Sequence, residues 1–222
     1  MSNIQVAAET YFTKGYASLD RFIAYAYQLE DVRATRPKQM LFIGVGDGLV
    51  VDLLRKNPEL SVTTLDIDPA LHPDVVGDVR SLPFEDGSFD LICIYEVLEH
   101  LPFQESEKAL AELARVSRGF VAVSVPHRRT GLDIALKFPF IRTFLKRDIL
   151  KLSLLVPVRF PGFAVSKQHY WEIDWWTMKL GRVRAAMRKH FTIVAERTPP
   201  LDHYHHFFML RSLNADAKNR PL

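Results

Sequence analysis

The feature that most constrains the fold is an apolar run that ends in three alternating glycines, Gly44, Gly46 and Gly48. Glycine has no Cβ, so a strand that stops at such a repeat can turn tightly beneath a bound ligand. A second apolar run, 61–65, ends in Asp66, whose carboxylate can accept hydrogen bonds from both hydroxyls of a ribose. A separation of about 20 residues between glycine loop and acid is typical of a nucleoside-binding βαβ unit.

Two further motifs follow in the order that such a unit requires. A short apolar run leads to Asp78, and the stretch 89–101 reads FDLICIYEVLEHL. Taken together, residues 38–126 resemble the class I S-adenosylmethionine-dependent methyltransferases, in particular the type 11 group that includes the ubiquinone and menaquinone methylases. The motifs are specific for this superfamily and carry almost no information on the methyl acceptor.

The resemblance implies a Rossmann-like α/β fold, with a seven-stranded, mostly parallel sheet and helices on both faces. It also implies S-adenosyl-L-methionine as the cofactor. The glycine turn would cradle the methionine part, the acid after the second strand would hold the ribose, and the third strand would deliver an Asp to the adenine. The cofactor-binding residues expected on this basis are Gly44, Val45, Gly46, Gly48, Asp66, Ile67, Asp78, Val79 and Tyr95.

Two observations qualify the motif. The family usually has an acid two residues before the first glycine, and this chain has Phe42 there, while Asp47 inside the loop can compensate. A dinucleotide site would favour Gly-x-Gly-x-x-Gly, because its last glycine lets the helix pack under a pyrophosphate. No glycine follows Gly48 at that spacing, which favours S-adenosylmethionine over a nicotinamide cofactor.

The order of apolar runs predicts one methyltransferase domain over 1–222. We expect strands near 40–43, 61–66, 75–77, 89–94, 120–125, 191–196 and 206–213, and helices over 4–32, 49–56, 70–72, 103–116 and 176–190. Short apolar runs that alternate with helices are typical of a parallel sheet covered on both faces. The domain divides into an N-terminal helical lid (1–36), a cofactor-binding core (37–126), an insert (127–167), the rest of the core (168–213) and a polar tail (214–222). The first helix either packs on the sheet edge or covers the cofactor.

The composition is that of an ordinary globular protein, with 48% hydrophobic and 25% charged residues among 222. Cys93 is the only cysteine and lies in an apolar run, which excludes a disulfide framework. Neither a signal segment nor an apolar run of about 18 residues is evident in the sequence, so we expect a cytoplasmic protein.

The insert 127–167 carries nine Lys and Arg residues against two Asp, a net charge of +7. Its apolar and basic residues fall on opposite faces of a helix. This pattern favours a lid over a small or lipid-linked acceptor, or peripheral contact with an anionic membrane surface. A solvated basic helix and a nucleic-acid-binding surface are the alternatives, and nucleic acid is the less expected partner because no RNA-binding module is present.

Methyl transfer from a sulfonium depends mainly on alignment and, for an oxygen acceptor, on removal of one proton. Candidate catalytic residues must therefore lie near the carboxyl ends of the strands. His127 follows the fifth strand directly and His169 lies in the segment after the insert. His100 is more simply a capping or packing residue. His203, His205 and His206 lack a second set of ligands at metal-binding spacing, so no metal site is expected.

The acceptor atom is predicted to be oxygen. Enzymes that methylate amides and base amino groups carry an Asn-Pro-Pro-Tyr-type motif after the fourth strand. This chain has Tyr95-Glu96-Val97-Leu98 there. Two other functions compete with a metabolite methyltransferase. One is a non-catalytic Rossmann-like subunit that binds a partner protein, which the Phe42 departure favours. The other is an RNA-directed methyltransferase.

Overall fold

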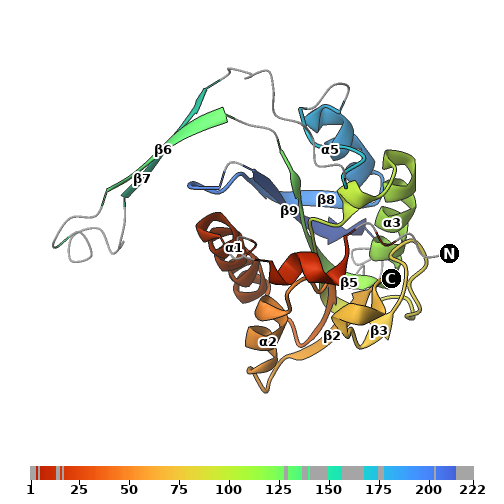
Figure 1. Cartoon of the computed structure of the whole chain (residues 1–222). Helices are drawn as coiled ribbons and strands as arrows, with labels where there is room; N and C mark the ends of the chain where they lie inside the picture. The colour runs from red at the N-terminus through yellow and green to blue at the C-terminus, as the bar shows by residue number, and fades with distance from the viewer. Residues whose placement is uncertain are drawn as a thin grey trace.

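The computed structural model describes residues 4, 6–13, 16, 18–127, 130–136, 140, 150–156, 168–174, 178–202 and 204–213. A short 3-10 helix and the longer helix α1 precede the sheet; helical elements then separate the strands up to the fifth, except between β3 and β4 (Figure 1). The elements are η1 (Ala8–Phe12), α1 (Leu19–Thr35), β1 (Gln39–Ile43), α2 (Leu49–Arg55), β2 (Ser61–Asp66), η2 (Pro69–Leu71), β3 (Val75–Val76), β4 (Phe89–Tyr95), η3 (Leu98–His100), α3 (Phe103–Val116), β5 (Ser117–Pro126), β6 (Thr130–Leu136), β7 (Leu150–Val156), α5 (Leu180–Arg188), β8 (Phe191–Arg197) and β9 (His205–Ser212).

The main sheet has seven strands in the order β3-β2-β1-β4-β5-β9-β8. Strands β1 to β5 run parallel, and β9 pairs antiparallel with both β5 and β8. The chain changes direction across the sheet between β1 and β4, and in such sheets ligands bind beyond the carboxyl ends of the strands at this switch point. The predicted fold class is confirmed.

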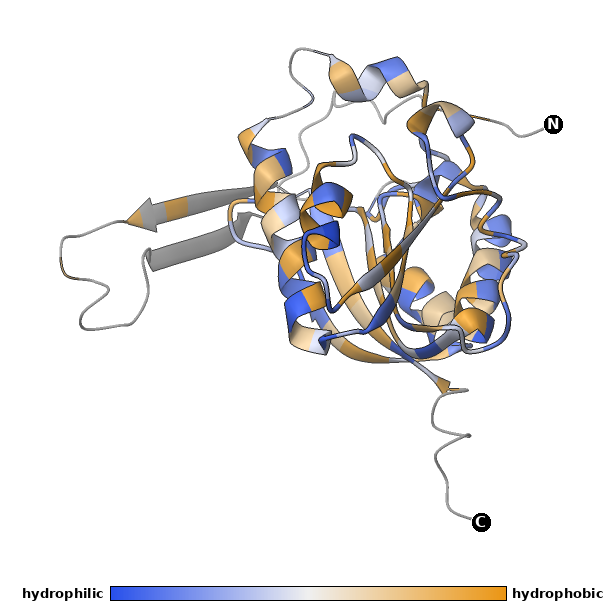
Figure 2. Cartoon of the chain, turned by 90° about the horizontal axis from the view of Figure 1, so that it is seen from below, coloured by the Kyte–Doolittle hydropathy of each residue, from blue (hydrophilic) through white to orange (hydrophobic). Residues whose placement is uncertain are grey.

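Side chains of β1 alternate between the two faces of the sheet. Leu41 and Ile43 pack in the cluster that includes α3 and α5, whereas Met40 and Phe42 pack in the cluster that includes α1 and α2. The helices are amphipathic in Figure 2, as expected for helices that cover a sheet on one side only. The result is three layers, with the sheet in the middle.

The predicted start of the first helix, at residue 4 of the range 4–32, is wrong. The α-helix α1 begins at Leu19, because Ser18 is extended and its side chain caps the Arg21 amide at 3.3 Å. The segment before it contains the short 3-10 helix η1. The helix predicted over 176–190 is also shorter than expected: α5 begins at Leu180, after an extended Lys179.

The prediction of a helix in the insert 127–167 is wrong for the residues of the insert that the structure describes as strands. Strands β6 and β7 form an antiparallel ribbon in which Thr130 pairs with Val156 and Leu136 with Leu150. In Figure 1 this ribbon extends away from the seven-stranded sheet. The sequence of β6 alternates Leu132, Ile134 and Leu136 with other residues, a period of two that favours a strand. Most of the predicted basic segment, 137–149 and 157–167, lies outside the described residues, with Phe140 as the exception. Contact of this segment with a membrane therefore stays a prediction. Cosedimentation of the protein with anionic vesicles would test it.

No helix in the described ranges is both long enough and apolar enough to span a bilayer.

A buried carboxyl group joins α1 to the sheet. The Tyr95 hydroxyl donates to Asp31 Oδ2 at 3.2 Å, and Arg197 Nη2 donates to Asp31 Oδ1 at 2.6 Å. Burial raises the pKa of the Asp31 carboxyl to about 6, although the Arg197 guanidinium opposes this shift. Folding therefore favours the protonated form of this group.

The pH dependence of stability should reveal this carboxyl. An unfolded Asp titrates near pKa 3.9, so the stabilisation from protonated Asp31 is complete below about pH 4 and is lost as pH rises through about 6. Relative to Asp31→Asn, the free energy of unfolding of the native chain should fall by roughly 2–3 kcal/mol between about pH 4 and about pH 7. Urea unfolding at several pH values measures this difference. A difference that grows with pH would mean that the Arg197 ion pair dominates instead.

Candidate active site

The site is a cavity at the carboxyl ends of β1 and β4. Its floor is the glycine loop after β1, and one wall is the chain after β4, from Glu96 to His100. Tyr11 and Tyr16, from the N-terminal segment, line the opposite side. The cavity therefore brings together segments that are distant in the sequence, and the N-terminal residues cover the glycine loop as a lid would.

Gly44 sets the shape of the floor. Its φ is +83°, a conformation that favours glycine, and a Cβ at this position would lie 2.6 Å from Val97 Cγ2. Gly46 also has a positive φ, and a Cβ there would reach the Tyr11 ring at 3.7 Å. The absence of a side chain on the first loop residue thus leaves room for the Val97 side chain from the turn after β4.

Asp66 orders the same loop from the end of β2. Its Oδ2 accepts from the Val45 amide at 2.8 Å and its Oδ1 accepts from the Asp68 amide at 2.9 Å. Burial raises the pKa of this carboxyl despite these hydrogen bonds. The side chain is buried beside the loop, and a ribose contact from Asp66 stays a prediction.

The nine expected cofactor residues divide into two groups. Gly44, Val45, Gly46 and Tyr95 line the cavity. The others lie along the adjoining strand ends and turns, outside the cavity lining: Gly48, Asp66, Ile67, Asp78 and Val79. The Asp78 carboxylate is engaged by Arg80, whose Nε donates to Oδ1 at 2.9 Å, and this ion pair lowers the pKa of Asp78. An adenine contact from Asp78 stays a prediction.

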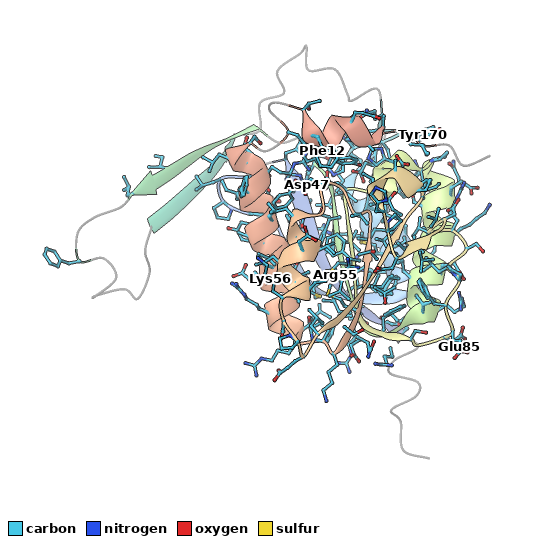
Figure 3. All side chains as sticks on the ribbon, turned by 60° about the horizontal axis from the view of Figure 1, so that its bottom comes forward. Phe12, Asp47, Arg55, Lys56, Glu85 and Tyr170 are labelled. Carbon is cyan, nitrogen blue, oxygen red and sulfur yellow. The ribbon has the colours of Figure 1, made fainter. Side chains whose placement is uncertain are left out.

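Phe42 leaves the first strand without the usual acid. Its ring packs edge-on against Tyr95, with centroids 5.9 Å apart, and both residues line the cavity. Asp47 is the nearby carboxylate, and Figure 3 shows it beside α1. It accepts from the Tyr25 hydroxyl at 2.7 Å and from the Leu49 amide at 3.1 Å. Asp47 therefore already connects α1 to the glycine loop.

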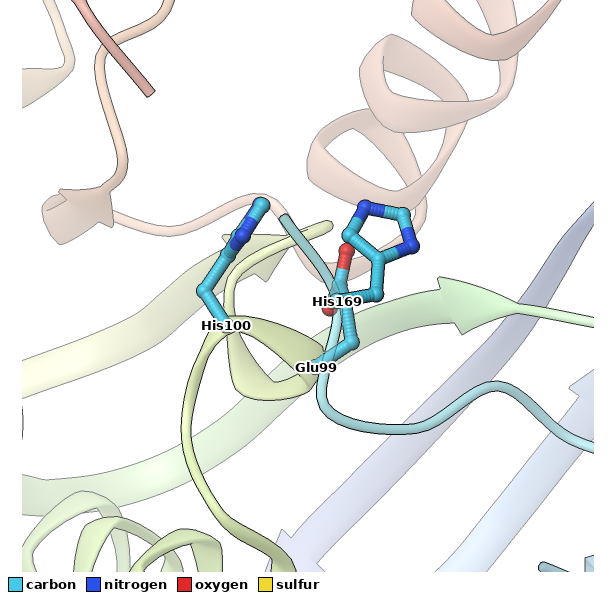
Figure 4. A group of neighbouring side chains, drawn as sticks. All are labelled: Glu99, His100 and His169. Atoms are coloured by element: carbon cyan, nitrogen blue, oxygen red, sulfur yellow. The ribbon is translucent and has the colours of Figure 1, made fainter. Parts of the chain in front are cut away.

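The cavity wall that begins with the turn after β4 carries a cluster of acidic and histidine side chains. Glu96, Glu99 and His100 come from the turn after β4, and His169 and His205 come from later segments; all five line the cavity. Figure 4 shows Glu99, His100 and His169 together, with the Glu99 carboxyl group between the two rings. Glu96 accepts from the Ser124 hydroxyl at 2.9 Å, and its backbone φ of +54° is unusual for a residue with a side chain.

Burial dominates the protonation of this wall. It raises the pKa of Glu96, and it raises that of Glu99 well above the usual range, with the neighbouring Glu96 charge adding to the effect. Burial lowers the pKa of His100. For His205, burial opposes the charged form, but Glu96 and then Asp202 raise its pKa overall. The cavity can therefore stabilise a bound cation or accept a proton.

His169 lies where the sequence predicts a catalytic residue, but His127 lies outside the cavity lining. His127 is buried at the end of β5, where its Nε2 contacts Asp174 Oδ2 at 2.8 Å and its Nδ1 contacts His206 Nδ1 at 2.9 Å. His206 in turn contacts Glu196 at 2.6 Å. A position directly after a strand does not fix which way the side chain points, and a catalytic role for His127 is not supported by this placement.

The sequence analysis missed most of the acidic wall. Glu96 and Glu99 are absent from the expected site, and His100 is treated there as a capping residue. A detectable signal was the spacing Glu96-x-x-Glu99-His100 directly after a buried strand. The contribution of His205 had no such signal, because only the fold shows that β9 pairs with β5, while β8 lies at the edge of the sheet. His203, from the same run, lies outside the described residues.

Comparison with known proteins agrees with the fold and with a methyltransferase domain in this chain. Residues 41–122 match the family model described as a methyltransferase domain. Norajmaline N-methyltransferase from Rauvolfia serpentina is 29% identical over 158 residues, which cover 62% of this chain and 53% of that protein. Ajmaline N-methyltransferase from the same species is 28% identical over 115 residues, covering 45% and 38%. The chain thus spans about half or less of these relatives.

Solved structures share the fold at low sequence identity. A SAM-dependent methyltransferase from Aquifex aeolicus superimposes with a TM-score of 0.62 at 12% identity, over 94% of this chain and 100% of that one. The N-methyltransferase NodS from Bradyrhizobium japonicum WM9, in complex with S-adenosyl-l-homocysteine, gives a TM-score of 0.58 at 12% identity, over 93% and 96%. Residues 41–122 thus resemble a methyltransferase domain, and the chain has the fold of S-adenosylmethionine-dependent methyltransferases.

Proposed function

We propose that the chain catalyses methyl transfer from S-adenosylmethionine to a nitrogen atom of a small organic acceptor. The observation that carries this proposal is the cavity itself, in which the half-buried carboxyl group of Glu96 and the fully buried one of Glu99 lie beside the glycine loop. A carboxylate held in such a place, as that of Glu96 is, attracts a protonated amine and can take its proton. The activities named for the two Rauvolfia relatives support the same acceptor atom.

This proposal departs from the oxygen acceptor predicted from the sequence. That prediction depends on a missing Asn-Pro-Pro-Tyr-type motif, and a missing motif is weaker support than two relatives with a named N-methyltransferase activity. The acidic lining adds an argument from charge. A phenol or sugar hydroxyl would have to lose its proton beside the Glu96 carboxylate, which disfavours an oxyanion, whereas an ammonium group gains from the same charge.

The reaction follows from alignment and one proton transfer. The acceptor amine gives a proton to a carboxylate, and its lone pair then attacks the methyl carbon. The new N–C bond forms as the C–S bond breaks, and the sulfonium becomes the thioether S-adenosylhomocysteine. Glu96 is placed to accept the proton, since it lines the cavity and its Oε1 is fixed by Ser124 at 2.9 Å.

Cofactor binding should depend on the Asp66 carboxylate. Asp66→Asn keeps the shape of the side chain but removes the charge that accepts from Val45 and Asp68. We expect S-adenosylhomocysteine to bind the variant at least about 10-fold more weakly, because hydrogen bonds to a charged group contribute roughly 1.5–3 kcal/mol. Isothermal titration calorimetry measures this. Asp52→Asn, an exposed substitution on α2, is the matched control and should bind like the native chain.

Turnover should depend on Glu96. Glu96→Gln should lower kcat on an amine acceptor by roughly 100-fold, the usual size of a lost general base, while S-adenosylhomocysteine affinity stays close to native. Because the pKa of Glu96 is raised, kcat of the native enzyme should fall with decreasing pH at values above the ordinary carboxylate range, and the variant should lose this dependence. The exposed Glu59→Gln serves as control.

The acceptor screen uses labelled S-adenosylmethionine with amines and matched phenols. Label transfer confined to the phenols would contradict a nitrogen acceptor. A folded chain that binds the cofactor and methylates no compound in the screen would favour the partner-binding subunit.

A further inference from the structure

The wall of the cavity contains a group of three metal-ligand side chains. Glu99 and His100 come from η3 (Leu98–His100), and His169 comes from the segment 168–174. One ligand atom from each lies within 4.8 Å of the other two. Figure 4 shows that the three side chains point toward one another. Donor atoms around a Zn²⁺ ion lie about 2 Å from it, so small side-chain rotations would bring this set to coordination distance.

Both imidazoles are held in an orientation that suits a ligand. His100 Nδ1 lies 2.9 Å from the Gln168 carbonyl oxygen, which can only accept, so Nδ1 carries the proton and Nε2 offers a lone pair. His169 Nδ1 lies 2.9 Å from Glu172 Oε1, and Glu172 is itself buried. Metal-binding histidines in proteins characteristically donate their other N–H to a carbonyl or a carboxylate in this way. The two rings therefore present the same kind of atom to one point.

Glu99 supplies the second, independent observation. Its side chain is completely buried, and neither carboxylate oxygen has a hydrogen-bond partner among the described residues. An orphaned buried carboxyl group is costly, and buried polar groups are nearly always satisfied. A cation bound between Glu99 and the two histidines would satisfy it. The carboxyl also lines the cavity, so an ion could reach it from there.

We propose that Glu99, His100 and His169 bind a divalent first-row transition metal ion at the wall of the methyl-transfer cavity. Two imidazoles and one carboxylate form a ligand set used for zinc and for other first-row metals with open coordination positions. This set favours Zn²⁺ over Mg²⁺, which prefers an octahedral shell of oxygen atoms.

The open coordination positions would face the cavity. They would hold an oxygen or nitrogen substituent of the acceptor, so that the reacting atom is aligned with the sulfonium. This role relies on the proposed function. It identifies the acceptor class as a small amine with a second, metal-binding heteroatom. The sequence analysis predicts no metal, because His100 and His169 are far apart in the chain and only the fold brings them together.

The test is metal binding by the full chain, measured without turnover. Protein stripped with a chelator is dialysed against Zn²⁺ or Mg²⁺, and bound metal is quantified by mass spectrometry. We expect one Zn²⁺ per chain and no stoichiometric Mg²⁺. Glu99→Gln, His100→Ala and His169→Ala should each weaken Zn²⁺ binding at least 10-fold, and Glu172→Gln should weaken it too, because loss of a group that orients a ligand typically costs about 10- to 100-fold. His190→Ala, at the end of α5 and outside the cavity lining, is the matched control and should bind as the native chain does.

A second readout keeps the test valid if a variant loses stability. Zn²⁺ should raise the thermal unfolding midpoint of the native chain and of the His190→Ala control but not that of Glu99→Gln, since a ligand that binds only the folded state stabilises it. Co²⁺ should give visible absorption bands that are lost in His169→Ala. Absence of stoichiometric Zn²⁺, or full retention of it in Glu99→Gln, would overturn the proposal. Native chain that binds S-adenosylhomocysteine but no Zn²⁺ would contradict only the metal site, whereas loss of S-adenosylhomocysteine binding would contradict the proposed function.

Discussion

The close approach of two turns is the constraint on which the cavity depends. Gly44 follows β1 with a positive φ, and the space where its Cβ would stand is occupied by the Val97 side chain after β4. Any other residue would be strained at this positive φ and would displace the Val97 side chain. Because Glu96, Glu99 and His100 belong to the second turn, the distance between the cofactor loop and the acidic wall is set at this contact. The strands that carry the two turns are also neighbours in the sheet. Strand β1 pairs directly with β4, with Met40 beside Leu91 and Ile43 beside Ile94.

The carboxyl groups near this contact are buried at a cost in stability. Asp31, Asp66, Glu96 and Glu99 all have a raised pKa, in each case chiefly because burial disfavours the charge. Structural carboxyls with a strong cationic partner usually show the opposite shift, as Asp78 does beside Arg80. Perturbed groups that line one cavity are characteristic of functional sites. Of the four, Glu96 and Glu99 line the cavity, whereas Asp66 orders the adjoining glycine loop and Asp31 accepts a hydrogen bond from Tyr95.

Much of the fold could be predicted from the sequence because its signals are local. The strand 61–66 and the helix 103–116 follow from unbroken apolar runs and one amphipathic stretch, and the structure places both at those residues. The glycine loop is a local signal too, since the backbone conformation there requires residues without side chains. The break between η1 and α1 was not predicted, because it depends on the helix cap at Ser18. The strands of the insert were not predicted either, because their sequence pattern also fits a helix.

The candidate site was less predictable because it depends on contacts between distant segments. Nothing in the local sequence says that His169 meets His100, or that His127 turns away from the cavity toward His206. The orphaned Glu99 carboxyl is equally invisible in a sequence, where a Glu after a strand reads as an ordinary surface residue. The sequence therefore predicts the strand ends as the region of the site, while the contacts within that region depend on the fold.

A crystal structure of the complex with S-adenosylhomocysteine tests the central claim most directly. If the cavity is the site of methyl transfer, the homocysteine part should lie along Gly44 to Gly46, the ribose hydroxyls should contact Asp66, and the sulfur atom should face the wall formed by Glu96 and Glu99. A cofactor bound elsewhere, or bound with its sulfur turned away from that wall, would contradict the account.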